Sequence, residues 1–303
     1  MFLEVKDVTK SIHGDVVIKN VSLCSERGRV IGLRGINGSG KTMLMRLISG
    51  LIRPTKGQVL IDGEVVSKDI PFPRSLGVLI EGPAFLDDYS AMDNLKLIAY
   101  PKGKVTEDEI KAVLSEVRLD PKSRKKYKKF SLGMKQRLGI ANAILHDPEL
   151  LILDEPTNGL DPIGIAEVRN FIKDLSVDRG KTILISSHIL SEIALLADDI
   201  GIIDHGVLLE ESSMEDLEKK NRKYIQLQVS DVPKASLILE RQFHVTDYAV
   251  QDEHNLRLYD TALDMAAINK ALVVQDVAVI SSQICNDTLE DYFKQITGGE
   301  GIA

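Results

Sequence analysis

The clearest chemistry in the chain comes from one run of eight residues: Gly35, Ile36, Asn37, Gly38, Ser39, Gly40, Lys41 and Thr42. The run fits GxxxxGK[ST], a loop whose glycines let backbone N–H groups turn toward phosphate oxygens. Lys41 would neutralise oxygens of the β- and γ-phosphates, and Thr42 would offer its hydroxyl to Mg²⁺. The run therefore predicts a phosphate cradle. The alternative is a glycine-rich turn with a surface lysine.

Two flanking segments are expected to position this loop. Arg29–Leu33 reads as a short buried strand, and Met43–Ile48 reads as an amphipathic helix that Gly50 closes. The helix would begin at the loop and add the positive end of its dipole to the phosphate site. Strand, glycine loop and helix thus stand in the order that a phosphate cradle needs.

Two adjacent acids, Asp154 and Glu155, follow the apolar run Leu150–Leu153. Ligands of an α/β sheet bind at the carboxyl ends of its strands, so we expect Asp154 to reach the Mg²⁺ near Thr42. Glu155 would then lie beside the attacking water of a phosphoryl transfer. The alternative is a solvated strand end.

The rest of the first two thirds of the chain alternates strand and helix patterns. Short apolar runs at Leu76–Ile80 and Thr182–Ile185 are typical of parallel strands buried on both faces. A helical pattern covers Asp93–Leu119, and another covers Ile165–Leu175. With antiparallel strands near the N-terminus, the pattern predicts an α/β fold with a mixed sheet, in a domain spanning residues 1–212.

A second domain is expected after a charged connector at 213–222. Residues 223–303 predict a small α+β domain with the order βαββαβ, the split βαβ arrangement. The elements are strand Tyr224–Val229, helix Val232–Arg241, strands through Tyr248 and Leu256, helix Met265–Leu272 and strand Val277–Gln283. No catalytic constellation accompanies them, so regulation, dimer support and no detectable role all remain open.

Composition narrows the class of protein. The 303 residues include 44% hydrophobic ones, enough for a sizeable core, but no uninterrupted apolar run of membrane-spanning length. The N-terminus lacks a signal-peptide layout, which favours the cytosol. A net charge of −7 argues against a broad nucleic-acid surface. The two cysteines, Cys24 and Cys285, lie far apart and suggest neither a disulfide framework nor a zinc site.

The order of motifs resembles the ATP-binding subunit of an ATP-binding cassette (ABC) transporter. Phe130–Gln136 resembles the family signature, Asn158–Asp161 resembles the D-loop, and Ser186–His188 resembles the stretch that carries the switch histidine. The resemblance spans Met1 to about Glu211. It implies a P-loop NTPase fold of the ABC type, with a helical subdomain at about 83–147.

The resemblance also implies a mechanism. In this family the glycine loop of one subunit and the signature of a second close around each ATP, which implies ATP, Mg²⁺ and a homodimer. Ser131 and Gly133 would then face the γ-phosphate at a helix start, with Asp161 nearby. Glu155 is the candidate general base, and His188 the γ-phosphate contact. The alternatives are a plain helix N-cap for Ser131 and a capped histidine before the next helix for His188.

Three departures from the family pattern stand out. Glu81 replaces the usual glutamine; it can still bind Mg²⁺, but it adds negative charge to the site. The usual adenine-stacking tyrosine is absent near Ile12 and His13, and Met134 replaces a glutamine of the signature. Glu81 with Ser-Leu-Gly-Met resembles the branch that protects cells against bacitracin and lantibiotics.

The resemblance implies an ATP hydrolase that energises a separate membrane permease and exports a peptide antibiotic, lantibiotic or similar amphipathic substrate. The permease would contact Pro83–Lys104 and hold the protein at the inner face of the membrane. The alternative is a soluble ABC ATPase that acts as a mechanical clamp on the ribosome or DNA. The transported substrate and its direction are not encoded in this chain, because the substrate would contact the permease.

Overall fold

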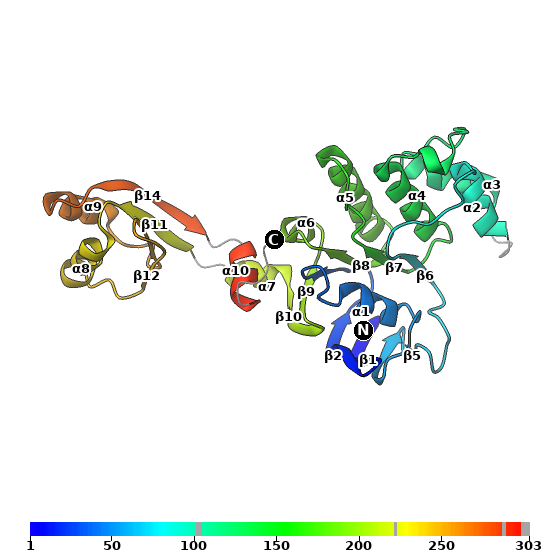
Figure 1. The fold of residues 1–303 in the computed structure, drawn as a ribbon, viewed down its shortest axis with the longest axis horizontal. Helices are drawn as coiled ribbons and strands as arrows, with labels where there is room; N and C mark the ends of the chain where they lie inside the picture. Colours follow the sequence, from blue (N-terminus) through cyan, green and yellow to red (C-terminus); the bar gives the residue numbers. More distant parts are fainter. Residues whose placement is uncertain (101–104, 221–222, 287–288, 298–303) are drawn as a thin grey trace. The chain divides into compact units, whose positions relative to one another are not determined.

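The computed structural model describes residues 1–100, 105–220, 223–286 and 289–297 (Figure 1). The chain divides into two compact units, Met1–Glu215 and Asp216–Ala303. Helix α7 (Met214–Lys220) contains this division and lies within the segment where the sequence predicts a linker. Residues 221–222 of that predicted linker lie outside the described residues.

A six-stranded sheet forms the centre of the first unit. Its order is β10 (Val207–Ser213), β9 (Asp199–Asp204), β3 (Val30–Arg34), β8 (Thr182–Ser187), β7 (Leu150–Asp154) and β6 (Leu76–Leu79). β10 pairs antiparallel with β9, and the other neighbours are parallel. Every residue of β3, β7 and β8 is buried, which explains their continuous apolar runs. Because these three strands are parallel, their carboxyl ends meet at one edge of the sheet.

A second, antiparallel sheet faces the first across a shared core. Its order is β2 (Asp15–Ser25), β1 (Leu3–Ile12), β4 (Lys56–Ile61) and β5 (Glu64–Val65). Helix α1 (Lys41–Ile48) lies in the same core, since its buried Leu44 and Ile48 cluster with residues of both sheets. The helix that begins at the glycine loop is therefore held on two sides by apolar packing.

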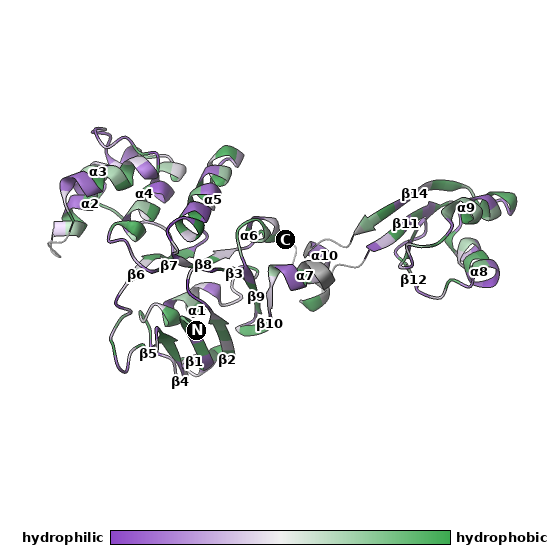
Figure 2. Ribbon diagram, turned by 180° about the vertical axis from the view of Figure 1, so that it is seen from behind, coloured by the Kyte–Doolittle hydropathy of each residue, from purple (hydrophilic) through white to green (hydrophobic). Residues whose placement is uncertain are grey.

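Further helices complete the first unit: α2 (Ala91–Ala99), α3 (Glu107–Glu116), α4 (Leu132–Ile144), α5 (Pro162–Val177) and α6 (Leu190–Ala194), with a short 3₁₀ helix at Tyr127–Lys129. The helical pattern over Asp93–Leu119 proves to be two helices. Thr106 starts the second one, because its side chain accepts from the Glu109 N–H and Glu109 reciprocates in a capping box. Figure 2 shows both hydrophilic and hydrophobic residues along α3 and α5, as expected of helices with one face on a core.

The second unit contains β11 (Lys223–Val229), α8 (Val232–Phe243), β12 (Tyr248–Val250), β13 (Asn255–Leu258), α9 (Met265–Val274) and β14 (Val279–Asn286), followed by α10 (Leu289–Ile296). The first six elements have the βαββαβ order that the sequence predicts. Their antiparallel sheet has the order β12-β13-β11-β14. Ile225 and Leu227 of β11 pack with Leu239 of α8 and Leu272 of α9 in a separate core.

None of the described helices combines the length and the apolar character needed to cross a bilayer.

Candidate functional site

The glycine loop lies between β3 and α1, and two of its glycines stand where a side chain would clash or where the backbone is left-handed. A Cβ on Gly35 would lie 2.4 Å from the Ile203 carbonyl oxygen, and Gly40 has φ +110° at the start of α1. Only glycine meets both conditions without strain. The loop can therefore turn its backbone N–H groups inward at the amino end of α1, where the dipole favours an anion.

Lys41 is buried at the bottom of this loop. Its Nζ donates to the carbonyl oxygens of Gly35 at 2.7 Å and Ile36 at 3.1 Å, so the loop wraps around the ammonium group. The Nζ also lies 3.5 Å from a carboxylate oxygen of Glu155. Burial lowers the pKa of Lys41, and the nearby Glu155 and Asp154 partly oppose that shift. A cation is thus fixed where the sequence predicts contact with phosphate oxygens.

Asp154 ends β7 and joins the loop to the neighbouring strand. The Thr42 hydroxyl donates to Asp154 Oδ2 at 2.7 Å, and the Ser186 hydroxyl donates to Asp154 Oδ1 at 2.6 Å. Ser186 Oγ in turn accepts the Glu155 N–H at 2.9 Å. Asp154 is buried, and both of its oxygens are held by hydroxyl groups. The carboxylate is therefore fixed in orientation beside Thr42.

Glu155 and His188 meet at the carboxyl ends of β7 and β8. His188 Nδ1 lies 2.8 Å from Glu155 Oε2, and Glu155 has a left-handed backbone with φ +47°. Such a conformation costs a non-glycine residue of order 1 kcal/mol or more, and strained positions of this kind cluster at functional sites. One carboxylate oxygen of Glu155 thus faces His188, and the other faces Lys41.

A second acid holds the segments on either side of this pair. Glu192 of α6 accepts hydrogen bonds from Thr157 at 2.7 Å and from Ser187 at 3.1 Å. Thr157 follows Glu155 by two residues, and Ser187 precedes His188. Glu192 therefore fixes the spacing between the two chain segments that present Glu155 and His188.

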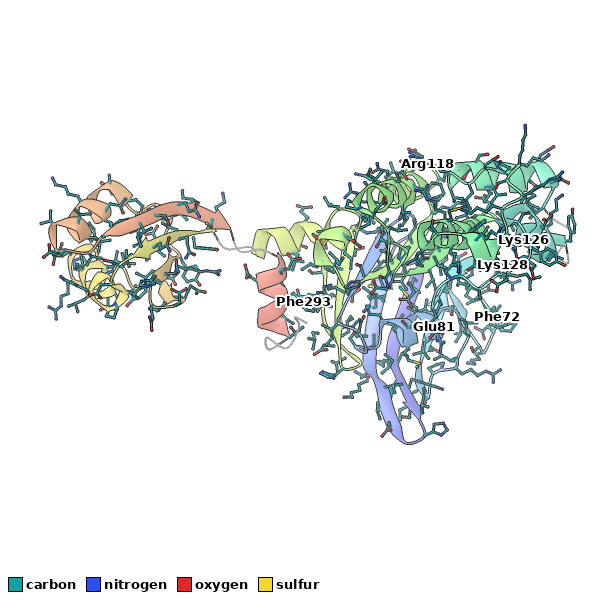
Figure 3. The ribbon with its side chains drawn as sticks, turned by 45° about the horizontal axis from the view of Figure 1, so that its top comes forward. Phe72, Glu81, Arg118, Lys126, Lys128 and Phe293 are labelled. Carbon is teal, nitrogen blue, oxygen red and sulfur yellow. The ribbon has the colours of Figure 1, made fainter. Side chains whose placement is uncertain are left out.

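Glu81 lies on the loop after β6 with φ +60°, and its carboxylate forms an ion pair with Arg46 of α1 (Glu81 is labelled in Figure 3). The sequence predicts Glu81 as an Mg²⁺ ligand with an unbalanced negative charge. The structure supplies a cation for that charge. Arg46 follows Thr42 by four residues, so both lie on the same side of the helix.

Lys41, Thr42, Arg46 and the three carboxylates Glu81, Asp154 and Glu155 line one pocket of about 340 Å³. Its walls include the residues Val17, Asn37, Gly38, Ser39, Gly40, Lys41, Thr42, Met43, Arg46, Glu81, Asp154 and Glu155. Val17 comes from β2, whereas Ile12 and His13, near which the sequence places the missing tyrosine, are not part of this lining. The pocket is thus rich in phosphate-binding groups and poor in aromatic ones.

Ser131, Gly133 and Asp161 line a different pocket, of about 330 Å³, together with Arg137 and Gly159. Ser131 caps α4 by accepting the Met134 N–H at 3.3 Å, and Asp161 caps α5 by accepting the Gly164 N–H at 2.8 Å. The linings of the two pockets share no residue. Within one chain, the signature and the D-loop therefore lie together, but apart from the glycine loop.

The residues of the first pocket suit a nucleotide and Mg²⁺. The Ser39 hydroxyl is buried and has no hydrogen-bond partner in the described part of the chain, so it can donate to a phosphate oxygen. Thr42 and Asp154 offer the oxygen ligands that Mg²⁺ prefers. The described residues contain no cluster of three or more His, Cys, Asp or Glu that could hold a metal ion by itself. An Mg²⁺ that is shared with phosphate oxygens fits this sparse donor set.

Sequence reasoning missed three residues that organise the pocket: Arg46, Ser186 and Glu192. Helical spacing could have found Arg46, because it follows Thr42 by four residues on α1. Glu192 had no such signal, because His188 precedes α6 and the partners of Glu192 are Thr157 and Ser187. The contact from Ser186 to Asp154 depends on the pairing of β7 with β8, for which the sequence gives no local signal.

Comparison with known proteins places the chain among ATP-binding subunits. A family model described as "ABC transporter" matches residues 18–158, and one described as "AAA domain, putative AbiEii toxin, Type IV TA system" matches residues 124–194. The chain is 42% identical over 302 residues to the bacitracin transport ATP-binding protein BcrA of Enterococcus faecalis, covering 99% of this chain and 98% of the relative. The BcrA protein of Bacillus licheniformis is 43% identical over 301 residues, with the same coverage. The lantibiotic transport ATP-binding protein SrtF of Streptococcus pyogenes is 42% identical over 214 residues, covering 70% of this chain and 91% of the relative.

Comparison with solved structures supports the same type of fold. An ATP-binding subunit of an ABC transporter superposes with a TM-score of 0.65 at 30% identity, covering 73% of this chain and 93% of that one. The dimeric ABC transporter cassette MJ0796 superposes with a TM-score of 0.64 at 22% identity, covering 70% and 98%, which supports the fold alone. The predicted P-loop fold with a mixed sheet and helices is thereby confirmed.

Proposed function

The chain belongs to the ABC transporter family, as an ATP-binding and ATP-hydrolysing subunit, and we propose that it hydrolyses Mg²⁺-bound ATP in a homodimer to drive a separate permease that exports a peptide antibiotic. The observation that carries this proposal is the meeting of Lys41, Glu155 and His188: Lys41 and Glu155 line the glycine-loop pocket, and His188 contacts Glu155. A cation for the phosphates and a carboxylate for the water lie side by side there.

Glu155 is the proposed general base. The contact with His188 holds one of its oxygens, and the fixed Glu155 backbone aims the side chain into the pocket. His188 contacts the γ-phosphate and orients Glu155 at the same time. Thr42 and Asp154 would hold Mg²⁺, which when bound would supply positive charge to the phosphates. Lys41 and the loop N–H groups bind the same oxygens without moving, because they are already held in place.

The separation of the two pockets supports a shared site. Ser131 and Gly133 lie at the exposed amino end of α4, in a pocket that shares no lining residue with the glycine loop. A second copy of the chain would bring its Ser131, Gly133 and Asp161 to the open side of the first pocket. The helix dipole of α4 would then face the γ-phosphate. ATP would thus hold two chains together before it is hydrolysed.

A permease contact is proposed on the loop before α2 and on α2 itself. Large apolar side chains are exposed along this segment: Leu86, Tyr89, Leu97, Ile98 and Tyr100. Exposed apolar groups of this density favour a protein partner over solvent. Residues 101–104 of the predicted contact lie outside the described residues. This partner would place the protein at the inner face of the membrane.

The relatives favour a transported peptide. The similar proteins are named for bacitracin and lantibiotic transport, and the Glu81 and Ser-Leu-Gly-Met traits predict the same branch. The predicted alternative, a soluble clamp on the ribosome or DNA, gains no support from these relatives. We therefore assign the chain to export of, or protection against, a peptide antibiotic of this class.

The Glu155→Gln variant tests the proposal. We expect its turnover of ATP to fall at least a hundredfold, because a general base contributes about 10²–10⁴ in rate. ATP binding should persist, since the glycine loop and Lys41 remain. Phosphate release and ATP titration on the purified full chain would measure the two effects.

Glu149→Gln is a matched control, because Glu149 is an exposed acid that pairs with Arg27 away from the pocket. Its turnover should equal that of the wild type. Normal turnover by Glu155→Gln would remove Glu155 from the role of base. Failure of the wild type to bind ATP at all would overturn the proposed function itself.

A further inference from the structure

The glycine-loop pocket has an unfavourable charge balance for a polyphosphate. Five charged side chains line it: the cations Lys41 and Arg46 and the carboxylates Glu81, Asp154 and Glu155. A nucleoside triphosphate adds several negative charges to a site that already has more acids than bases. Asp154 and Glu155 have roles in the proposed chemistry, whereas Glu81 is an additional acid. Its charge must be offset for phosphate to bind well.

Arg46 is the group in position to offset that charge. Its guanidinium pairs with the Glu81 carboxylate, and both side chains line the pocket. The side chain of Arg46 is 34% exposed and that of Glu81 is 57% exposed. Ion pairs as exposed as this contribute little to folding stability. The consequence of the pair therefore lies in the electrostatic potential of the pocket.

We propose that Arg46 is a positioning residue for nucleotide binding, which holds Glu81 and cancels its charge so that the pocket accepts a polyphosphate. The inference rests on the proposed function and deepens it. Without Arg46, the Glu81 carboxylate would be an unpaired negative charge in the phosphate pocket. At an effective dielectric constant near 20, one unit charge roughly 6 Å from a phosphate corresponds to about a hundredfold change in affinity, and solvent screening of this partly exposed pair reduces the expected change to about tenfold.

A double-mutant cycle separates this role from others. The four proteins are the full-length wild type, Arg46→Gln, Glu81→Gln and the double variant, and calorimetry measures their affinity for ATP with and without Mg²⁺. Arg46→Gln should weaken ATP binding about tenfold. The double variant should bind ATP as tightly as Glu81→Gln alone, because the acid that Arg46 balances is then absent.

The charge of the ligand supplies a second readout. The loss caused by Arg46→Gln should be greatest for Mg²⁺-free ATP, smaller for ADP and absent for adenosine, which is neutral. A general defect of folding would weaken all three ligands alike. Arg74→Gln is the matched control, since Arg74 forms an exposed pair with Glu64 at 2.7 Å outside the pocket. It should leave every affinity unchanged.

Two outcomes would overturn the inference. An equal loss of ATP affinity from Arg46→Gln in the wild-type and Glu81→Gln backgrounds would show that Arg46 binds phosphate directly. No loss in either background would show that the pair is an ordinary surface contact. Both outcomes leave the proposed function intact. In this experiment the proposed function fails if the wild type binds ATP no more tightly than adenosine.

Discussion

Replacing Ser186 with alanine tests how the pocket is held in shape. The hydroxyl of Ser186 is fully buried, donates to Asp154 at 2.6 Å and accepts the Glu155 N–H at 2.9 Å. The substitution removes a hydrogen bond to a charged group and leaves a backbone donor without this acceptor. Each such loss costs about 1–3 kcal/mol. Because the two bonds share one hydroxyl, we expect a combined loss of about 2–3 kcal/mol in the free energy of unfolding.

For a unit of this size, 1 kcal/mol corresponds to a shift of about 2–4 °C in the melting temperature, so the first unit should melt roughly 4–12 °C lower. Turnover of ATP should fall as well, because Asp154 loses one of the two hydroxyl contacts that fix its orientation. Thermal unfolding followed by calorimetry measures the first effect, and phosphate release measures the second.

Ser176→Ala is the matched control. Ser176 is also buried, but its hydroxyl donates to the Gly28 carbonyl at 2.9 Å, away from the pocket. We expect it to cost about 1 kcal/mol and to leave turnover unchanged. Equal stability and equal turnover in the two variants would refute the reasoning, since Ser186 would then contribute no more than an ordinary neutral hydrogen bond.

Two further predictions concern Lys41, which lines the same pocket, and Glu192, which lies outside its lining. Lys41→Ala should weaken ATP binding about a hundredfold, because charge-assisted hydrogen bonds contribute about 1.5–3 kcal/mol each. ATP titration measures this change in affinity. Normal affinity would contradict the assignment of Lys41 to a phosphate cradle. Glu192→Ala should slow ATP turnover while leaving ATP affinity unchanged, because Glu192 holds Thr157 and Ser187 but is not part of the pocket lining. A change in ATP affinity with normal turnover would contradict this role of Glu192 in fixing the two segments.

Local sequence signals predict the parts of the site that lie within one short segment. Gly35, Gly40 and Lys41 act through the backbone of a single loop, so their spacing alone is informative. The buried strands β7 and β8 could likewise be predicted, because each contains a continuous apolar run within one short segment. The helical pattern over Asp93–Leu119 did not give the division into two helices, because periodicity does not register a new N-cap such as Thr106.

Contacts between distant segments could not be read from the sequence. The pairing of Glu81 with Arg46 depends on how the loop after β6 packs beside α1, and these residues are 35 positions apart in the sequence. The grouping of Ser131 with Asp161 depends on the packing of α4 beside the start of α5. Each residue type is visible in the sequence, but its partner is set by tertiary structure.

The central claim is that one ATP site is built from two chains, and substitutions at Ser131 test it most directly. In a Glu155→Gln background, Ser131→Asp and Ser131→Thr both preserve a side chain able to cap α4, but only aspartate adds a negative charge. Light scattering with and without ATP would measure the mass of each variant, and titration would measure ATP binding to the monomer.

The account predicts that both variants bind ATP equally well and that only the threonine variant becomes a dimer, because the aspartate would meet the γ-phosphate across the interface. Dimers formed equally by the two variants would contradict this claim. Weaker binding of ATP to the aspartate monomer would contradict it too, since Ser131 would then belong to the site of its own chain.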